Sequence, residues 1–92
     1  MKTTKWDSAK YLTSEAAIAE YLTAMMEDGD PRAITHALGV VARARGMSRL
    51  AKKSGVTREA LYRALNADGN PEFATVLKVI NAMGLKLSVK AA

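Results

Sequence analysis

The sequence predicts a single, mainly α-helical domain of five helices that contains a helix-turn-helix and ends in a short β-strand. Three observations support this prediction. The chain has 92 residues, 49% hydrophobic and 25% charged, which is typical of one small globular domain. Apolar residues recur every three or four positions over most of its length. Residues 47–66 have the spacing of two short helices joined by a tight turn.

The chain is expected to begin with an arm, residues 1–13, that packs on the domain. The first helix is predicted over residues 15–27, because Ser14 is a suitable N-cap and Gly29 a suitable end signal. The apolar side chains that recur along it are Ile18, Tyr21, Leu22, Met25 and Met26.

A second helix is predicted to begin at Pro31 and to end at Gly46. Asp30 supplies a capping carboxylate, and a proline is well tolerated in the first turn of a helix. The residues expected on its buried side are Ile34, Ala37, Leu38 and Val41.

The most informative feature is the predicted helix-turn-helix of residues 47–66. Its two helices are expected over residues 48–54 and 57–66. Ser48 and Thr57 are the predicted N-caps, because a hydroxyl oxygen can accept a hydrogen bond from a backbone amide of the first turn.

Small and apolar residues at fixed spacing favour this motif. Ala51 is placed where the two helices cross closely, and Gly55 is expected to adopt a positive φ in the turn. Val56 and Leu61 fall where the second helix must pack back on the first. The residues assigned to the core of the motif are Leu50, Ala51, Val56, Leu61 and Leu65.

A fifth helix is predicted over residues 73–83, after a turn signal at residues 68–71 and before the end signal Gly84. Its expected buried residues are Phe73, Val76, Leu77, Ile80 and Met83.

A β-strand is predicted over residues 85–90, because Leu85, Leu87 and Val89 alternate with polar residues. A single strand leaves its backbone groups unpaired. The strand must therefore pair with the N-terminal arm, with a second copy of the chain or with another protein.

The charge of the chain is unevenly distributed. Residues 43–63 contain seven basic residues and one acid, a local net charge of +6. Residues 1–30 contain three lysines and six acids, a local net charge of −3. The net charge of the whole chain, +5, therefore comes from the segment that holds the helix-turn-helix. A basic block in that place is typical of phosphate binding by a DNA-binding protein.

The outward side chains of the motif are the candidate DNA contacts. Arg58 and Arg63 are suited to guanine or to the backbone, and Glu59 either accepts from cytosine or stabilises the helix dipole. Tyr62 either touches the backbone or lies half-buried. Ser48 and Arg49 are expected to hold phosphates. The full predicted set is Ser48, Arg49, Lys53, Thr57, Arg58, Glu59, Tyr62, Arg63 and Asn66.

Several other functions are disfavoured. The chain has no cysteine, which excludes disulfides and thiolate metal sites, and its one histidine, His36, has no motif that would place it in a catalytic triad. Isolated glycines do not form a phosphate loop. We therefore expect no enzyme, no cofactor and no metal. Because there is neither a long apolar run nor a signal-peptide pattern, the expected location is the cytoplasm, without a membrane partner.

Two blocks, ARARGMSRLAKKSGVTREALYRAL and GNPEFATVLKVINAMGLKL, go beyond a general motif. With the segments KWDSAKYL and EAAIAEYLTAMMEDGD before them, they closely resemble the addiction-module antidote proteins. These are antitoxins with a lambda-repressor-like helix-turn-helix of the Xre type, HigA-like. The resemblance covers nearly the whole chain. The sequence departs from the family pattern mainly at Ser54 and Ala64, where larger apolar residues are common in the core of a helix-turn-helix.

The resemblance implies an antitoxin that binds operator DNA, represses its own operon as a homodimer and neutralises a RelE/ParE-like toxin. The alternative is a stand-alone transcriptional regulator with no toxin, and a third interpretation is a protein-interaction module that no longer binds DNA. Two surfaces could serve partners: the C-terminal strand and the acidic N-terminal half. The acidic residues that would complement a basic toxin are Glu15, Glu20, Glu27, Asp28 and Asp30.

Overall fold

A computed structural model describes residues 14–66 and 68–92. The predicted N-terminal arm, residues 1–13, lies outside the described residues. The described chain forms five α-helices and no strand, which confirms the mainly α-helical prediction. The helices are α2 (Glu15–Met26), α3 (Pro31–Arg45), α4 (Met47–Ser54), α5 (Arg58–Ala64) and α6 (Phe73–Ala82).

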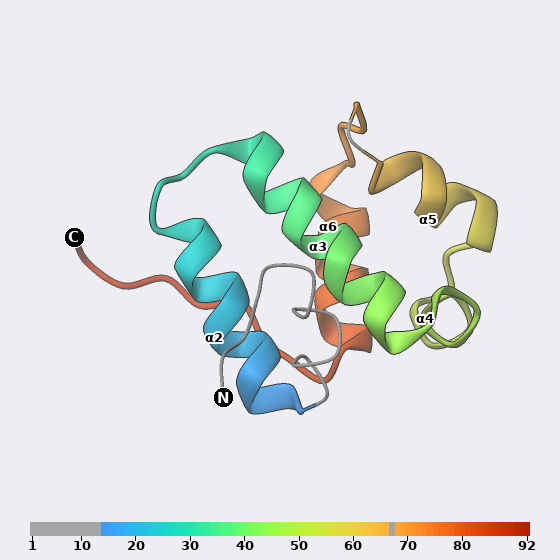
Figure 1. Cartoon of the computed structure of the whole chain (residues 1–92), viewed down its shortest axis with the longest axis horizontal. Coiled ribbons are helices and arrows are strands. Elements are labelled where there is room, and N and C mark those ends of the chain that lie inside the picture. Colours follow the sequence, from blue (N-terminus) through green and yellow to red (C-terminus); the bar gives the residue numbers. More distant parts are fainter. Residues whose placement is uncertain (1–13, 67) are drawn as a thin grey trace, which may run out of the picture.

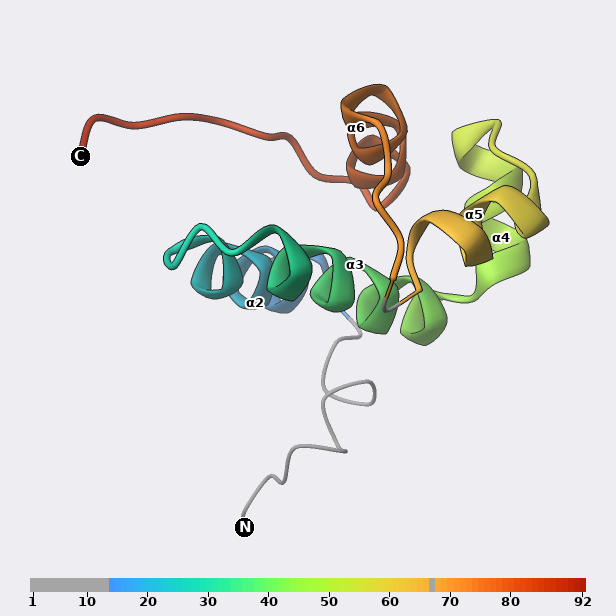
Figure 2. The same cartoon turned by 90° about the horizontal axis from the view of Figure 1, so that it is seen from above.

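The helices are arranged around α3, which crosses the middle of the molecule (Figure 1). Helix α2 packs on α3, α3 packs on α4, and α4 contacts both α5 and α6. In the view from above, α2 and α5 lie at opposite ends, with α3 and α6 between them (Figure 2). The molecule therefore presents two separate helical surfaces, one formed by α2 and the other by α4 and α5.

Polar side chains set the beginnings of α2 and α3 as predicted. The Ser14 hydroxyl accepts a hydrogen bond from the amide of Ala17 (3.1 Å). The Asp30 carboxylate accepts one from the amide of Arg32 (3.1 Å), and Pro31 occupies the first turn of α3. These caps satisfy amides that have no partner inside the helix.

The core lies where α2 packs on α3 and where α4 packs on α3, α5 and α6. It is built from one apolar side of each helix, so burial of that side provides the main stabilisation of this small fold. Of the described residues, those that make up the buried core are Ile18, Leu22, Ala37, Leu38, Val41, Ala42, Met47, Leu50, Leu61, Leu65, Val79, Ile80 and Met83.

The fifth predicted helix is correct in position, but one of its predicted core residues is wrong. Ile80 and Met83 are buried and Val76 and Leu77 half-buried, whereas Phe73 is 66% exposed. Phe73 is the first residue of α6. Helical side chains lean toward the N-terminus of their helix, so the side chain of a first residue extends past the helix end and away from the core.

The predicted C-terminal strand is absent. Residues 85–92 follow α6 without regular secondary structure and run back over the side of the molecule that carries α2 (Figure 2). The physical reason is that the described chain offers no neighbouring strand, and a strand is stable only when its backbone groups are paired.

The backbone that follows α5 approaches α3 closely at Gly39. A Cβ atom added there would lie 2.8 Å from the carbonyl oxygen of Leu65, which follows α5. This distance is shorter than a normal van der Waals contact. Gly39 therefore allows the end of α5 to pack directly on α3.

We predict that Gly39→Ala destabilises the protein by about 1 to 3 kcal/mol, because the methyl group forces the α5 end away from α3. Urea unfolding followed by circular dichroism measures this change. An unstrained glycine-to-alanine change inside a helix stabilises it by roughly 0.5–1 kcal/mol. A gain in stability of that size would show that α3 and α5 are not in close contact at Gly39.

Candidate nucleic-acid interface

The turn between α4 and α5 has the predicted glycine conformation. Gly55 has a φ of 77°, in the left-handed region, and its amide donates to the carbonyl of Ala51 (3.0 Å). A residue with a Cβ is strained in this conformation. Gly55 therefore ends α4 and turns the chain toward α5.

Ser54 closes the same turn with its side chain. Its hydroxyl donates to the carbonyl of Ala51 (3.3 Å) and accepts from the amide of Val56 (3.2 Å). At this position the resemblance predicts a larger apolar residue, from which Ser54 departs. The structure shows why a polar residue suits this half-buried position: its one hydroxyl bridges two backbone groups of the turn. A serine two residues before the amide it binds was the available signal.

Thr57 caps α5 as predicted, because its hydroxyl accepts a hydrogen bond from the amide of Ala60 (3.1 Å). The corresponding prediction for Ser48 is wrong. Helix α4 begins one residue earlier, at Met47, and Gly46 stands at its N-cap without a side-chain hydrogen bond. Gly46 has a φ of 100° and is also the C-cap of α3, so a single residue joins the two helices and leaves no room for a separate cap.

The two helices of the motif are fixed by their buried residues. Leu50, Leu61 and Leu65 belong to the core as predicted, with exposed fractions of 3% or less. Ala51 and Val56 are half-buried and pack against that core. Because α5 has only seven residues, burial of Leu61 determines which of its side chains face outward.

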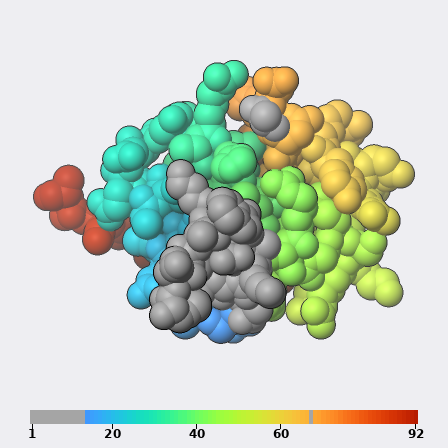
Figure 3. Space-filling view, in the orientation of Figure 1, coloured from blue at the N-terminus to red at the C-terminus, as the bar shows by residue number. Residues whose placement is uncertain are grey.

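All nine predicted DNA contacts are exposed. They are Ser48, Arg49, Lys53, Thr57, Arg58, Glu59, Tyr62, Arg63 and Asn66. The structure places them on α4, on α5 and at the ends of these helices. In the space-filling view α4 and α5 form the edge of the molecule on the side away from α2 (Figure 3).

Arg58 and Tyr62 interact with each other on the surface of α5. The Arg58 guanidinium carbon lies 5.6 Å from the centroid of the Tyr62 ring, which is within the range of a cation–π contact. The tyrosine is 46% exposed, so part of its ring is covered and part is accessible to a ligand. The pair is spaced four residues apart, which brings side chains together on one helix face. Tyr62 thereby orients Arg58.

Asn66 lies beyond the end of α5 and has a local structural role. Its side-chain oxygen accepts a hydrogen bond from the amide of Asp68 (2.8 Å), and its carbonyl accepts one from the amide of Gly69 (2.9 Å). The predicted helix end at residue 66 is thus two residues too far, because Ala64 is the last residue of α5. For contact with a base, Asn66 has its side-chain NH2 group as a donor and a second lone pair on its side-chain oxygen.

Positively and negatively charged side chains lie on different parts of the molecule. The basic residues of segment 43–63 are carried by the last turn of α3, by α4 and by α5, whereas α2 and the turn after it carry exposed acids. The exposed acids of that region are Glu15, Glu20, Glu27, Asp28 and Asp30. A strongly anionic ligand is therefore attracted to the α4–α5 side and repelled by the α2 side.

The described residues form neither a metal site nor a membrane-spanning helix. His36 is exposed on α3, and nowhere in residues 14–66 and 68–92 do three or more His, Asp or Glu side chains come together in a way that could hold a metal ion. In the same part of the chain, each helix is too short or too polar to cross a membrane.

Comparison with known proteins gives the family of the chain. Residues 2–91 match the family described as probable addiction module antidote protein. An uncharacterised protein of Haemophilus influenzae is 46% identical over 85 residues, which cover 92% of this chain and 88% of that protein. No solved structure shows significant similarity. Because the family match spans almost the entire sequence, the chain belongs to the probable addiction module antidote proteins.

Proposed function

We propose that this protein is the antitoxin of a type II toxin–antitoxin module. In this proposal it binds operator DNA through α4 and α5, represses its own operon as a homodimer and neutralises a RelE/ParE-like toxin by direct binding. The observation that carries the DNA-binding part is the exposed basic surface on two short helices joined by the Gly55 turn. Membership of the antidote family supports the antitoxin part.

Helix α5 is the proposed recognition helix in the major groove. Its first turn is capped by Thr57, and the exposed Arg58 side chain, held over the Tyr62 ring, is available on its surface for a phosphate or base. Arg63 is the proposed base contact, because a guanidinium can donate two hydrogen bonds to guanine. Glu59 is placed to accept from a cytosine amino group.

Helix α4 is the proposed phosphate-binding helix. Ser48 and Arg49 are exposed in its first turn, and Lys53 is exposed in its last turn. Contacts of this kind fix the position of a protein on the duplex and contribute a salt-dependent part of the affinity that does not depend on sequence. In a two-fold dimer the α5 helices would read half-sites about one helical turn apart.

The toxin is proposed to bind the acidic surface of α2. Glu20, Glu27 and Asp28 are exposed there and would complement a basic toxin. Because α2 and α5 lie at opposite ends of the molecule, one copy has room for both ligands at once (Figure 1).

We predict that Arg63→Ala weakens binding to operator DNA by roughly 1 to 3 kcal/mol and relaxes preference at one base pair, because a base contact is lost. Lys53→Ala should weaken binding to all sequences alike. It should also reduce, by about 1, the slope of the logarithm of the binding constant against the logarithm of the salt concentration. Fluorescence anisotropy with operator and scrambled duplexes at several salt concentrations measures both effects.

Lys78→Ala is the matched control, because it removes one exposed positive charge from α6, outside segment 43–63. It should leave both affinities nearly unchanged. If Arg63→Ala and Lys53→Ala reduced binding to the two duplexes equally, the division between a reading helix and a phosphate helix would be wrong.

We predict that the double variant Glu20→Lys/Asp28→Lys loses at least about tenfold in affinity for the toxin, because like charges then face each other across the interface. The probe is the purified product of a small basic reading frame next to this gene, and calorimetry measures the affinity. Glu72→Lys is the control, since it reverses an exposed acid before α6. Equal loss in the control would exclude α2 as the specific surface, and a neighbouring product that does not bind would favour the stand-alone regulator.

A further inference from the structure

The C-terminal tail comprises residues 85–92, in which apolar and polar residues alternate. No segment of the described chain pairs with it as a strand. Leu85 packs against the core, but the next two apolar residues are progressively more exposed, Leu87 at 38% and Val89 at 96%. Exposure of a large apolar side chain at the end of an alternating segment costs free energy unless another surface covers it.

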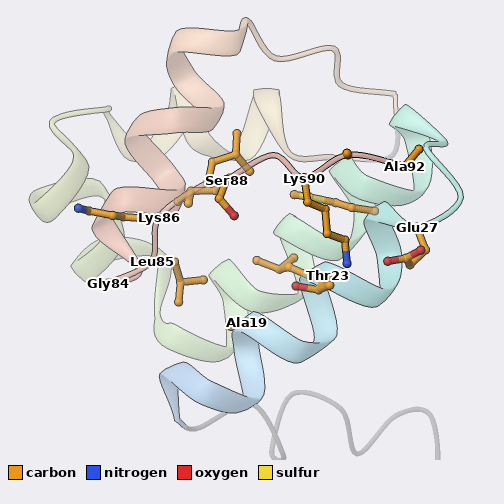
Figure 4. A pocket seen from close by; sticks show the side chains of 14 residues that line it. Ala19, Thr23, Glu27, Gly84, Leu85, Lys86, Ser88, Lys90 and Ala92 are labelled. Atoms are coloured by element: carbon orange, nitrogen blue, oxygen red, sulfur yellow. The ribbon is translucent and has the colours of Figure 1, made fainter.

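A groove separates the tail from α2. It has a volume of about 850 Å³ and is lined on one side by α2 and on the other by the tail (Figure 4). Leu22 and Met26 contribute to its apolar part, whereas Glu27 and Lys90 bring opposite charges to it. The tail therefore stands away from the body of its own chain with an uncovered edge.

We infer that the tails of two copies pair as antiparallel β-strands about a two-fold axis at Leu87. In this register Leu87 faces the partner's Leu87, and Leu85 faces the partner's Val89. Each exposed Val89 is then placed beside a leucine that is anchored on the partner's core. On the other face Lys86 meets the partner's Ser88, so no two lysines lie opposite each other. Cross-strand pairs of this kind are the unit of sheet stabilisation.

Other registers are less favourable for the same sequence. An axis at Ser88 would place Lys86 directly opposite the partner's Lys90, and like charges in that position are destabilising. A register shifted by one residue would set apolar residues opposite polar ones on both faces. The positive charge of the lysines and the alternation of apolar and polar residues therefore both favour a two-fold axis at Leu87.

The chemistry of the tail favours a second copy as the occupant. Its sequence is self-complementary in one register, which a symmetric interface requires. Two strands alone are marginally stable, but here each is fixed at one end by Leu85 on its own core. Lys90 also points toward α2, where Glu27 lines the same groove (Figure 4).

The inference deepens the homodimer part of the proposed function and is tested without DNA. The chain has no cysteine, so single-cysteine variants give unambiguous cross-links. In the inferred register the two Cα atoms at position 87 are about 4.5–5.5 Å apart, within reach of a disulfide. The two Cα atoms at position 88 are diagonal neighbours, about 7–8 Å apart, and out of reach.

The experiment is mild oxidation of full-length Leu87→Cys and Ser88→Cys, followed by non-reducing electrophoresis. We expect a cross-linked dimer for Leu87→Cys and mainly monomer for Ser88→Cys. Cross-linking of Ser88→Cys as readily as Leu87→Cys would overturn the register. Absence of a cross-link in both variants would overturn the inferred contact.

A second measurement uses sedimentation equilibrium. Leu87→Lys should weaken the dimer by at least about tenfold in Kd, because two lysines then meet at the axis. Ala91→Lys adds the same charge outside the paired residues and should leave the dimer intact. Unchanged helical circular dichroism shows that both variants are folded.

A wild-type protein with the mass of a single chain at micromolar concentration, or a dimer unaffected by Leu87→Lys, would contradict the inference. A dimer that cross-links at Leu87 but does not bind DNA would contradict the proposed function alone.

Discussion

Burial of Leu61 and Leu65 in the core, where α5 packs on α4 and the backbone after α5 approaches α3, is the constraint on which the candidate interface depends. Both residues are almost completely buried, and the backbone at Leu65 approaches Gly39 so closely that a Cβ there would not fit. A helix of seven residues with Leu61 turned inward has few ways to orient its other side chains. Arg58 and Arg63 are exposed because of this packing, so the proposed recognition surface is a consequence of the core.

The separation of charge gives this small domain two surfaces of different chemistry. The basic surface lies on α4 and α5, and the acidic one on α2, with α3 between them (Figure 1). An anionic duplex and a basic protein would thus approach opposite ends, which reduces competition between them. The tail adds a third surface, near α2, where a second copy could pair. Dimerisation there would leave α5 of each copy exposed.

Local signals in the sequence predicted most of the fold because their physics is local. The cap at Thr57 and the positive φ of Gly55 depend only on residues within one helical turn, and both are confirmed. The structure differs from the prediction where the environment of a residue depends on contacts with distant parts of the chain. The exposure of Phe73 depends on where α6 begins relative to the core, and a strand over residues 85–90 requires a partner that the described chain does not supply. The double role of Ser54 appears only once the turn geometry is known. The predicted contact residues are exposed because the buried leucines of the two helices turn the other side chains outward.

Binding of the purified wild-type protein to DNA from immediately upstream of its gene tests the central claim most directly. A labelled upstream duplex and a scrambled duplex of equal length are titrated at two salt concentrations. The account predicts saturable binding that prefers the upstream duplex and weakens as salt rises, because basic residues of segment 43–63 replace counterions on phosphates. Weak and equal binding to both duplexes would contradict the claim that α4 and α5 form a sequence-reading interface.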